Sequence, residues 1–320
     1  MLEPPPRQAT PGIAYRRATA DDLVACAGIW RDSINDYTRR LNQPDIPEDL
    51  TAILRLYGHL HANDPAGFVV AEQAVDGGPP AVVAFASSVR REDLWFLSML
   101  FVLPGVQKGG LGRGLLAKVM PAPGTATLAT CTDSAQPISN GLYASLGMVP
   151  RMPLVRLVGL PERDGHLPPL PRGIRAVRFD ELDGAAAAHL DDELSTIDRA
   201  TAGFGHLEDH AFVARAESRV GILFIGGDGR PVGYGYTSEA GRVGPIAVLD
   251  PDLLAAVIGH LVTAVVPRGA FGVWMPGDAG EAMAALLGAG FRMEGFPCLV
   301  CWDRPITDFS RYVPISPGLL

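Results

Sequence analysis

The sequence is short of cysteine and has no long apolar segment. Four cysteines among 320 residues predict a chain that keeps its thiols reduced, in the cytoplasm. The longest apolar helix-like run, 253–266, is too short for a membrane span and is interrupted by His260. The first residues, MLEPPPRQATPG, lack the cationic start and apolar centre of a secretory signal. We therefore expect a cytoplasmic protein without a membrane anchor.

The chain also lacks an excess of positive charge. Its formal net charge is −8, which disfavours broad nucleic-acid or anionic-membrane surfaces and mildly favours cationic substrates. A hydrophobic content of 48% is that of a globular protein, so the 37 glycines and 28 prolines are expected in turns and linkers. A length of 320 residues favours two domains over one.

The most informative stretch joins an apolar strand to a helix through a glycine-rich loop. Residues 97–103 have the length and the Phe and Val content of a buried strand, which Pro104 should end. The helix is expected from Gly114 onward. In the loop between them, four glycines allow a tight turn and a close approach by a ligand. The free N–H groups of the following helix make this an anion site, most naturally for phosphate.

Two common phosphate loops do not fit this stretch. It has no Gly-Lys-Ser/Thr ending, and position 115 is Leu where a Rossmann fingerprint requires Gly. The pattern Val102-x-Pro104-x-x-Gln107-x-x-Gly110-x-Gly112 instead resembles the acetyl-CoA motif of the GNAT superfamily, the Gcn5-related N-acetyltransferases. A tight turn without a ligand is the alternative.

A second motif supports the same resemblance. Asn140, Tyr143 and Gly147-Met148 are similar to the family's Asn…Tyr-x-x-x-Gly-Phe, with Met in place of Phe. The expected order of strands and helices over 13–160 also resembles the GNAT fold. The resemblance implies acetyl-CoA as co-substrate, no metal, Tyr143 as general acid and Asn140 as a cofactor contact. It also implies cofactor contacts by Leu100, Phe101, Val102, Gln107, Lys108, Gly109, Gly110, Leu111, Gly112 and Arg113.

The second half of the sequence repeats the pattern of the first. We expect an α/β (α+β) protein of two tandem GNAT-like domains, each a mixed, mostly antiparallel sheet flanked by helices. The predicted divisions are a flexible arm (1–12), the GNAT domain (13–160), a Pro-rich linker (161–173), a degenerate GNAT-like domain (174–305) and a tail (306–320).

The second copy is expected to be non-catalytic. Asp250-Pro251-Asp252 replaces the glycine loop, so a capped helix end with two carboxylates stands where phosphate would bind. Leu286 stands at the position equivalent to Tyr143.

No general base is evident in the sequence. Glu92, Asp93, His59 and His61 are candidates, each more typical of a solvated surface, and a chain of water molecules is an alternative.

Two further motifs are weak signs of a metal site. His206 and His210 have a ligand-like i, i+4 spacing but are expected to be a surface pair without a third ligand. The single Cys298-x-x-Cys301 is expected to be two buried cysteines.

The sequence thus predicts an acetyl-CoA-dependent N-acetyltransferase that acts on a primary amine of a small molecule. The alternative is a non-catalytic acyl-CoA-binding sensor or interaction protein. The sequence leaves open whether the protein forms a homodimer.

Overall fold

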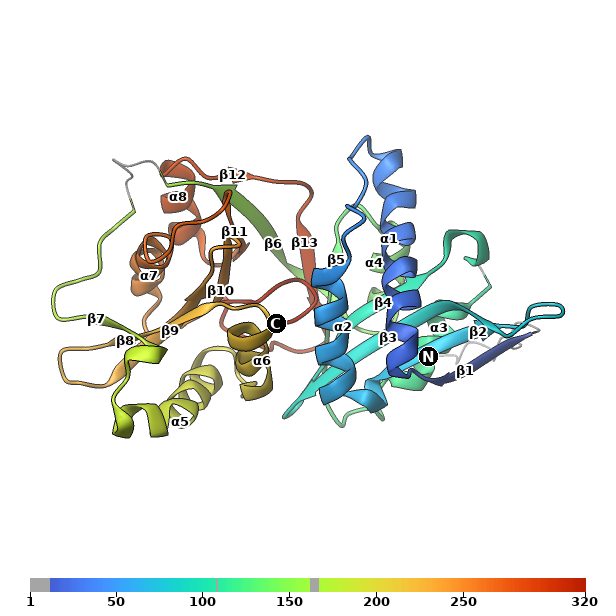
Figure 1. Ribbon diagram of the computed structural model, residues 1–320, viewed down its shortest axis with the longest axis horizontal. Coiled ribbons are helices and arrows are strands. Elements are labelled where there is room, and N and C mark those ends of the chain that lie inside the picture. Colours follow the sequence, from blue (N-terminus) through green and yellow to red (C-terminus); the bar gives the residue numbers. More distant parts are fainter. Residues whose placement is uncertain (1–11, 108, 162–166) are drawn as a thin grey trace. The chain divides into compact units, whose positions relative to one another are not determined.

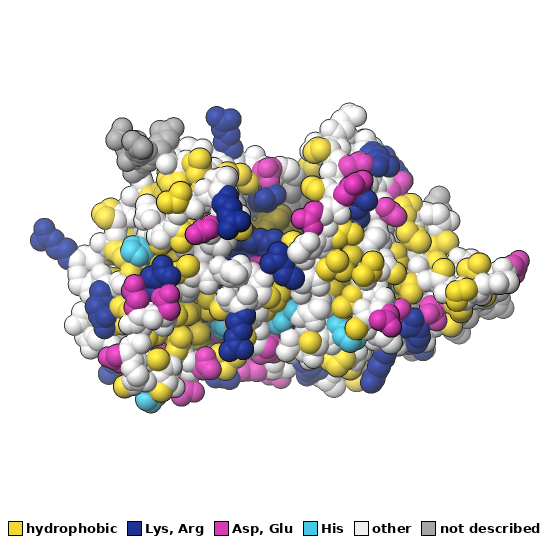
Figure 2. Space-filling view, viewed as in Figure 1, with side chains coloured by type: hydrophobic (Ala, Val, Ile, Leu, Met, Phe, Trp, Pro, Cys, Tyr) yellow, Lys and Arg dark blue, Asp and Glu magenta, His cyan; other side chains and the backbone are white. Residues whose placement is uncertain are grey.

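The computed structural model describes residues 12–107, 109–161 and 167–320, which form two compact units. Unit 1 comprises 1–90 and 95–126, and unit 2 comprises 91–94 and 127–320. The expected arm and the first part of the expected linker fall on positions outside the described residues. Among the described residues, every helix is too short or too polar to cross a bilayer. On the face in Figure 2, acidic and basic side chains are interspersed.

Unit 1 is a sheet with strand order β1-β2-β3-β4 and three helices (Figure 1). Its elements are β1 (Ile13–Arg17), α1 (Leu23–Arg40), α2 (Thr51–Asn63), β2 (Phe68–Gln73), β3 (Ala81–Arg91), β4 (Leu94–Val102) and α3 (Leu111–Val119). The tip of the β3–β4 hairpin, 91–94, counts with unit 2. The strand–loop–helix prediction is confirmed, with β4 and α3 each beginning three residues earlier than expected.

Aromatic packing joins α2 to this sheet. The ring of Tyr57 lies 6.0 Å from that of Phe68 and 5.4 Å from that of Phe85, both edge to face. All three side chains are fully buried. Burial of such large rings is a major source of core stability, so this cluster fixes α2 on the sheet.

Unit 2 contains a longer sheet with the order β5-β13-β6-β11-β10-β9-β8-β7. Its strands are β5 (Thr127–Asp133), β6 (Val149–Gly159), β7 (Arg175–Arg178), β8 (Val220–Ile225), β9 (Pro231–Thr237), β10 (Arg242–Val248), β11 (Phe271–Pro276), β12 (Arg292–Met293), β13 (Cys298–Trp302) and β14 (Tyr312–Val313). Its helices are α4 (Pro137–Ala144), α5 (Gly184–Thr201), α6 (Leu207–Ala211), α7 (Leu254–Leu261) and α8 (Gly280–Gly288). The pairing of β10 with β11 is parallel, and the other pairings are antiparallel.

Strands from the two halves of the sequence alternate in this sheet. β13 pairs with β5 on one edge and with β6 on the other, and β6 in turn pairs with β11. β13 thus lies between two strands of the first half, and β6 lies between two strands of the second, which satisfies the backbone N–H and C=O groups on both edges of each.

Candidate functional site

The glycine-rich loop leaves the N-terminus of α3 open. Residues of β4 are buried up to Met99 but only half-buried from Leu100 to Val102, where the strand ends. A turn of 3₁₀ helix, Pro104–Val106, follows. Gly110 then adopts a left-handed backbone (φ 78°), and α3 begins at Leu111 without a side-chain cap. The N–H groups of the first helical turn are therefore available to an anion.

Two side chains hold the end of β4, one from the loop and one from α1. The carbonyl oxygen of Val102 accepts hydrogen bonds from Gln107 Nε2 at 3.1 Å and from Ser33 Oγ at 3.0 Å. Gly109, Gly110 and Arg113 are exposed, while Lys108 lies outside the described residues. Gln107 thus bridges the strand end and the turn, and the loop presents its backbone at the surface.

A tyrosine side chain occupies the space beside Gly114. A Cβ atom at this position would lie 2.1 Å from the hydroxyl oxygen of Tyr15 in β1. The sequence motif did not indicate this role, because the contact comes from a strand a hundred residues earlier in the chain.

The second motif lies on α4 in unit 2. Tyr143 is 5% exposed, and its hydroxyl has no hydrogen-bond partner among the described residues. Burial, with smaller contributions from Cys301 and Cys131, raises the pKa of Tyr143 well above its ordinary value. The phenol is therefore protonated at neutral pH, as a proton donor must be.

Asn140 ties α4 to the preceding strand. Its Nδ2 donates to the carbonyl oxygens of Asp133 at 3.0 Å and of Gln136 at 2.8 Å. Its Oδ1 is buried and has no partner among the described residues. A buried acceptor without a donor is costly, so Asn140 Oδ1 is suited to a ligand N–H or O–H.

The corresponding helix of the second half is closed. The Asp250 carboxylate accepts a hydrogen bond from the Asp252 backbone N–H at 3.0 Å, and Pro251 occupies the first helical position. The expected cap at Asp250 is confirmed. A cap of this kind uses an N–H group that an anion would otherwise bind.

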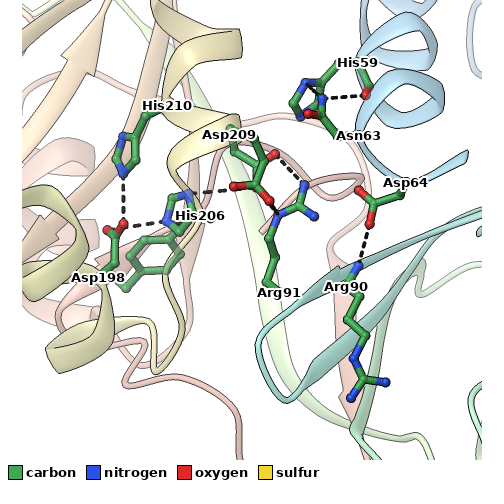
Figure 3. Close-up of polar contacts among 11 residues, drawn as sticks. His59, Asn63, Asp64, Arg90, Arg91, Asp198, His206, Asp209 and His210 are labelled. Carbon is green, nitrogen blue, oxygen red and sulfur yellow. Dashed lines mark hydrogen bonds and ion pairs between the residues drawn. The ribbon is translucent and has the colours of Figure 1, made fainter. Parts of the chain in front are cut away.

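The candidate bases are largely engaged in other contacts. Glu92 accepts a hydrogen bond from Arg199 Nε at 2.8 Å. His61 Nε2 lies 3.2 Å from the Ala18 carbonyl oxygen. His59 was expected at the surface but is buried, and its Nδ1 lies 3.0 Å from Asn63 Nδ2 (Figure 3). Asp93 is exposed.

The expectation of a surface pair at His206 and His210 is wrong. Both imidazoles are buried and face the carboxylate of Asp198, which is itself fully buried (Figure 3). Sequence reasoning missed Asp198 because it lies on another helix, α5, in a stretch with several other acidic residues. Buried tyrosines of β9 and β14 surround the cluster, and only the tertiary structure brings these segments together.

A family model matches part of the chain. Residues 27–148 are similar to the model of the acetyltransferase (GNAT) family. The matched segment includes the glycine loop and extends through Tyr143 to Met148.

Solved structures share the fold of the whole chain. A Pyrococcus horikoshii protein, provisionally described as an acetyltransferase, is 15% identical with a TM-score of 0.72, and the match covers 100% of both chains. A GCN5-related N-acetyltransferase of Sphaerobacter thermophilus is 17% identical (TM-score 0.59; 95% of this chain, 100% of that one). A tandem GNAT protein of the clavulanic acid biosynthesis pathway is 14% identical (TM-score 0.55; 92% and 99%). Among curated proteins, no significant match was found. The chain therefore shares the fold of these structures.

Proposed function

We propose that this GNAT protein is an acetyl-CoA-dependent N-acetyltransferase that modifies the primary amine of a small molecule. The observation that carries the proposal is the uncapped N-terminus of α3, which follows the half-buried end of β4 through an exposed glycine loop. Such a helix end binds phosphate through its backbone N–H groups. The likeness of residues 27–148 to the acetyltransferase (GNAT) family supports coenzyme A as the source of that phosphate.

The residues of the chain fit acetyl-CoA in three respects. The loop amides from Gln107 to Gly112 and the side chain of Arg113 suit a pyrophosphate. The half-buried end of β4, from Leu100 to Val102, suits the amides of pantetheine, and the unpartnered Asn140 Oδ1 suits a further donor. When bound, acetyl-CoA supplies an activated acetyl thioester. We propose that the reaction uses no metal ion.

The residues also suit the proton transfers of amine acetylation. The attacking amine must lose a proton, and the departing thiolate must gain one. We propose that Tyr143 donates the second proton, since its hydroxyl is protonated and not committed to another group of the described chain. Backbone N–H groups of β4 near Leu100 polarise the thioester carbonyl. The proton of the amine passes to Asp93 or to a chain of water molecules, since Glu92 is paired with Arg199.

An assay of free thiol release with a panel of small amines tests the proposal. We expect turnover of acetyl-CoA that depends on the amine, together with an acetylated product detected by mass spectrometry. Tight acetyl-CoA binding without turnover across the panel would favour the sensor. No binding of acetyl-CoA would refute both functions.

A further inference from the structure

A chain of alternating charges is buried in unit 2. Arg91, at the tip of the β3–β4 hairpin, donates two hydrogen bonds to Asp209 of α6, at 2.8 and 2.9 Å. Asp209 Oδ2 lies 4.0 Å from His206 Nδ1, and His206 Nε2 lies 3.4 Å from Asp198 Oδ1. His210 Nε2 completes the chain at 2.9 Å from Asp198 Oδ2 (Figure 3). All five residues are less than 5% exposed.

Further polar groups surround the chain. Tyr234 donates to Asp198 Oδ1 at 2.6 Å, the Tyr236 hydroxyl lies 2.9 Å from His210 Nδ1, and the Tyr312 hydroxyl lies 3.2 Å from His206 Nε2. The half-exposed Glu208 also approaches Arg91 Nε, at 3.0 Å. These contacts come from α6, β9 and β14.

The histidine geometry favours a proton over a metal ion. Asp198, His206 and His210 offer ligand atoms within 4.8 Å of one another, which is close enough for a metal site. However, the two rings are stacked, with centroids 4.6 Å apart and planes only 11° from parallel. An imidazole nitrogen binds a metal along a lone pair in its ring plane, and one ion cannot lie in two stacked planes.

Charge balance indicates how many protons the pair holds. With both histidines neutral, one arginine and two aspartates would leave one uncompensated negative charge in the interior. A single proton on the pair removes it. Two protons would place like charges on stacked rings 4.6 Å apart. The buried set is therefore neutral when the pair carries one proton.

His206 is the better site for that proton. Burial opposes a charge there, but the carboxylates of Asp198 and Asp209 outweigh burial and the effect of Arg91, and they raise the pKa of His206. Burial lowers the pKa of His210, and the charge on His206 lowers it further against the attraction of Asp198. The two aspartates thus face a cation at His206 and a neutral ring at His210.

We propose that the stacked pair His206–His210 holds one buried proton that locks the tip of the β3–β4 hairpin to α5 and α6. The protonated His206 lies between the carboxylates of Asp198 on α5 and Asp209 on α6. Asp209 in turn accepts the two hydrogen bonds from Arg91. At the same tip, Glu92 pairs with Arg199 of α5. Loss of the proton leaves an unbalanced buried charge and weakens the hold on the tip.

The lock has a defined pH dependence. Because the folded-state pKa of His206 lies above the unfolded value of 6.5, its contribution to stability is complete below pH 6.5 and is lost as pH rises through the folded-state pKa. His210 acts in the opposite direction: its neutral form is preferred in the folded state, so stability falls below pH 6.5. Burial lowers the pKa of His260 on α7 too, so His210 and His260 both contribute to the loss of stability below pH 6.5, the acid limb of the stability curve. The loss of stability above pH 6.5, the alkaline limb, identifies His206.

Thermal and chemical unfolding of the full chain between pH 5 and 8.5 tests the lock. Above pH 6.5 we expect the unfolding constant to rise about tenfold per pH unit until His206 has titrated. His206→Gln should abolish this limb, whereas His189→Gln, at an exposed position of α5, should keep it. Hydrogen exchange at 91–94, corrected for the intrinsic rate, should quicken over the same range in the wild type and in His189→Gln but not in His206→Gln.

The proposal would be overturned by the following results. The first is an alkaline limb that is missing in the wild type or retained in His206→Gln. The second is a stoichiometric gain in melting temperature with added Zn²⁺, reversed by a chelator, which would make the cluster a metal site. If His206→Gln does not fold, ¹⁵N-histidine NMR of the wild type decides. A ring protonated on both nitrogens well above pH 6.5 supports the lock, and neutral rings throughout refute it.

Discussion

Replacing Tyr143 with Phe removes one hydroxyl group and keeps the ring. The side chain is 5% exposed, and its hydroxyl has no partner among the described residues, so the change breaks no hydrogen bond within them. Loss of a buried hydroxyl without a partner is nearly neutral for folding, within about 1 kcal/mol. A purely structural Tyr143 therefore predicts normal stability and normal activity.

A catalytic Tyr143 predicts a different result. A general acid contributes about 10²–10⁴-fold to a rate, which corresponds to about 3–5 kcal/mol of transition-state stabilisation. We expect kcat to fall by this factor. Acetyl-CoA affinity should change little, because the proton is needed only as the thiolate leaves.

The assay is steady-state release of free thiol, with affinity measured separately by calorimetry and stability by urea unfolding. Tyr57→Phe is a matched control, since Tyr57 is also buried and its hydroxyl also lacks a partner. A fall of only a few-fold in Tyr143→Phe, with an active wild type, would refute the reasoning and leave water as the proton donor.

Three more predictions concern α3 and the corresponding helix of the second half. Gly112→Asp should weaken acetyl-CoA binding at least about tenfold, because a carboxylate there repels the phosphates and neutralises the positive end of the helix dipole that would attract them. Gly280→Asp is the control, because it lies at the start of α8 where an added Cβ meets no atom within 4 Å, and it should leave acetyl-CoA binding unchanged. Equal acetyl-CoA affinities of the two variants by calorimetry would contradict the loop assignment. Calorimetry should also find one acetyl-CoA per chain, since Asp250 caps the second helix; two comparable sites would oppose this. Gly114→Ala should lower stability by about 1–3 kcal/mol in urea unfolding, because its Cβ would collide with Tyr15, and an unchanged midpoint would disprove this contact.

Much of the loop could be predicted from the sequence because its determinants are local. Pro104 ends the strand, and Gly110 supplies the left-handed backbone that lets α3 begin at once. The cap at Asp250 was predictable for the same reason, since a short acceptor followed by Pro favours a helix start. The roles of Tyr143 and Asn140 remain predictions, which rest on the family motif and on the free acceptor of Asn140.

The tertiary structure decided the features that depend on contacts between distant segments. The pairing of β13 with β5 and β6 could not be predicted, because several apolar strands of similar length compete for the same edges and strand composition alone does not choose among them. The i, i+4 spacing of His206 and His210 is compatible with solvent or with burial. The sequence by itself thus predicted the strand, loop and helix from β4 to α3 and the cap at Asp250. Only the tertiary structure decided the strand exchange and the buried histidine pair, because burial and charge pairing depend on residues brought together from α5, α6 and the β3–β4 hairpin.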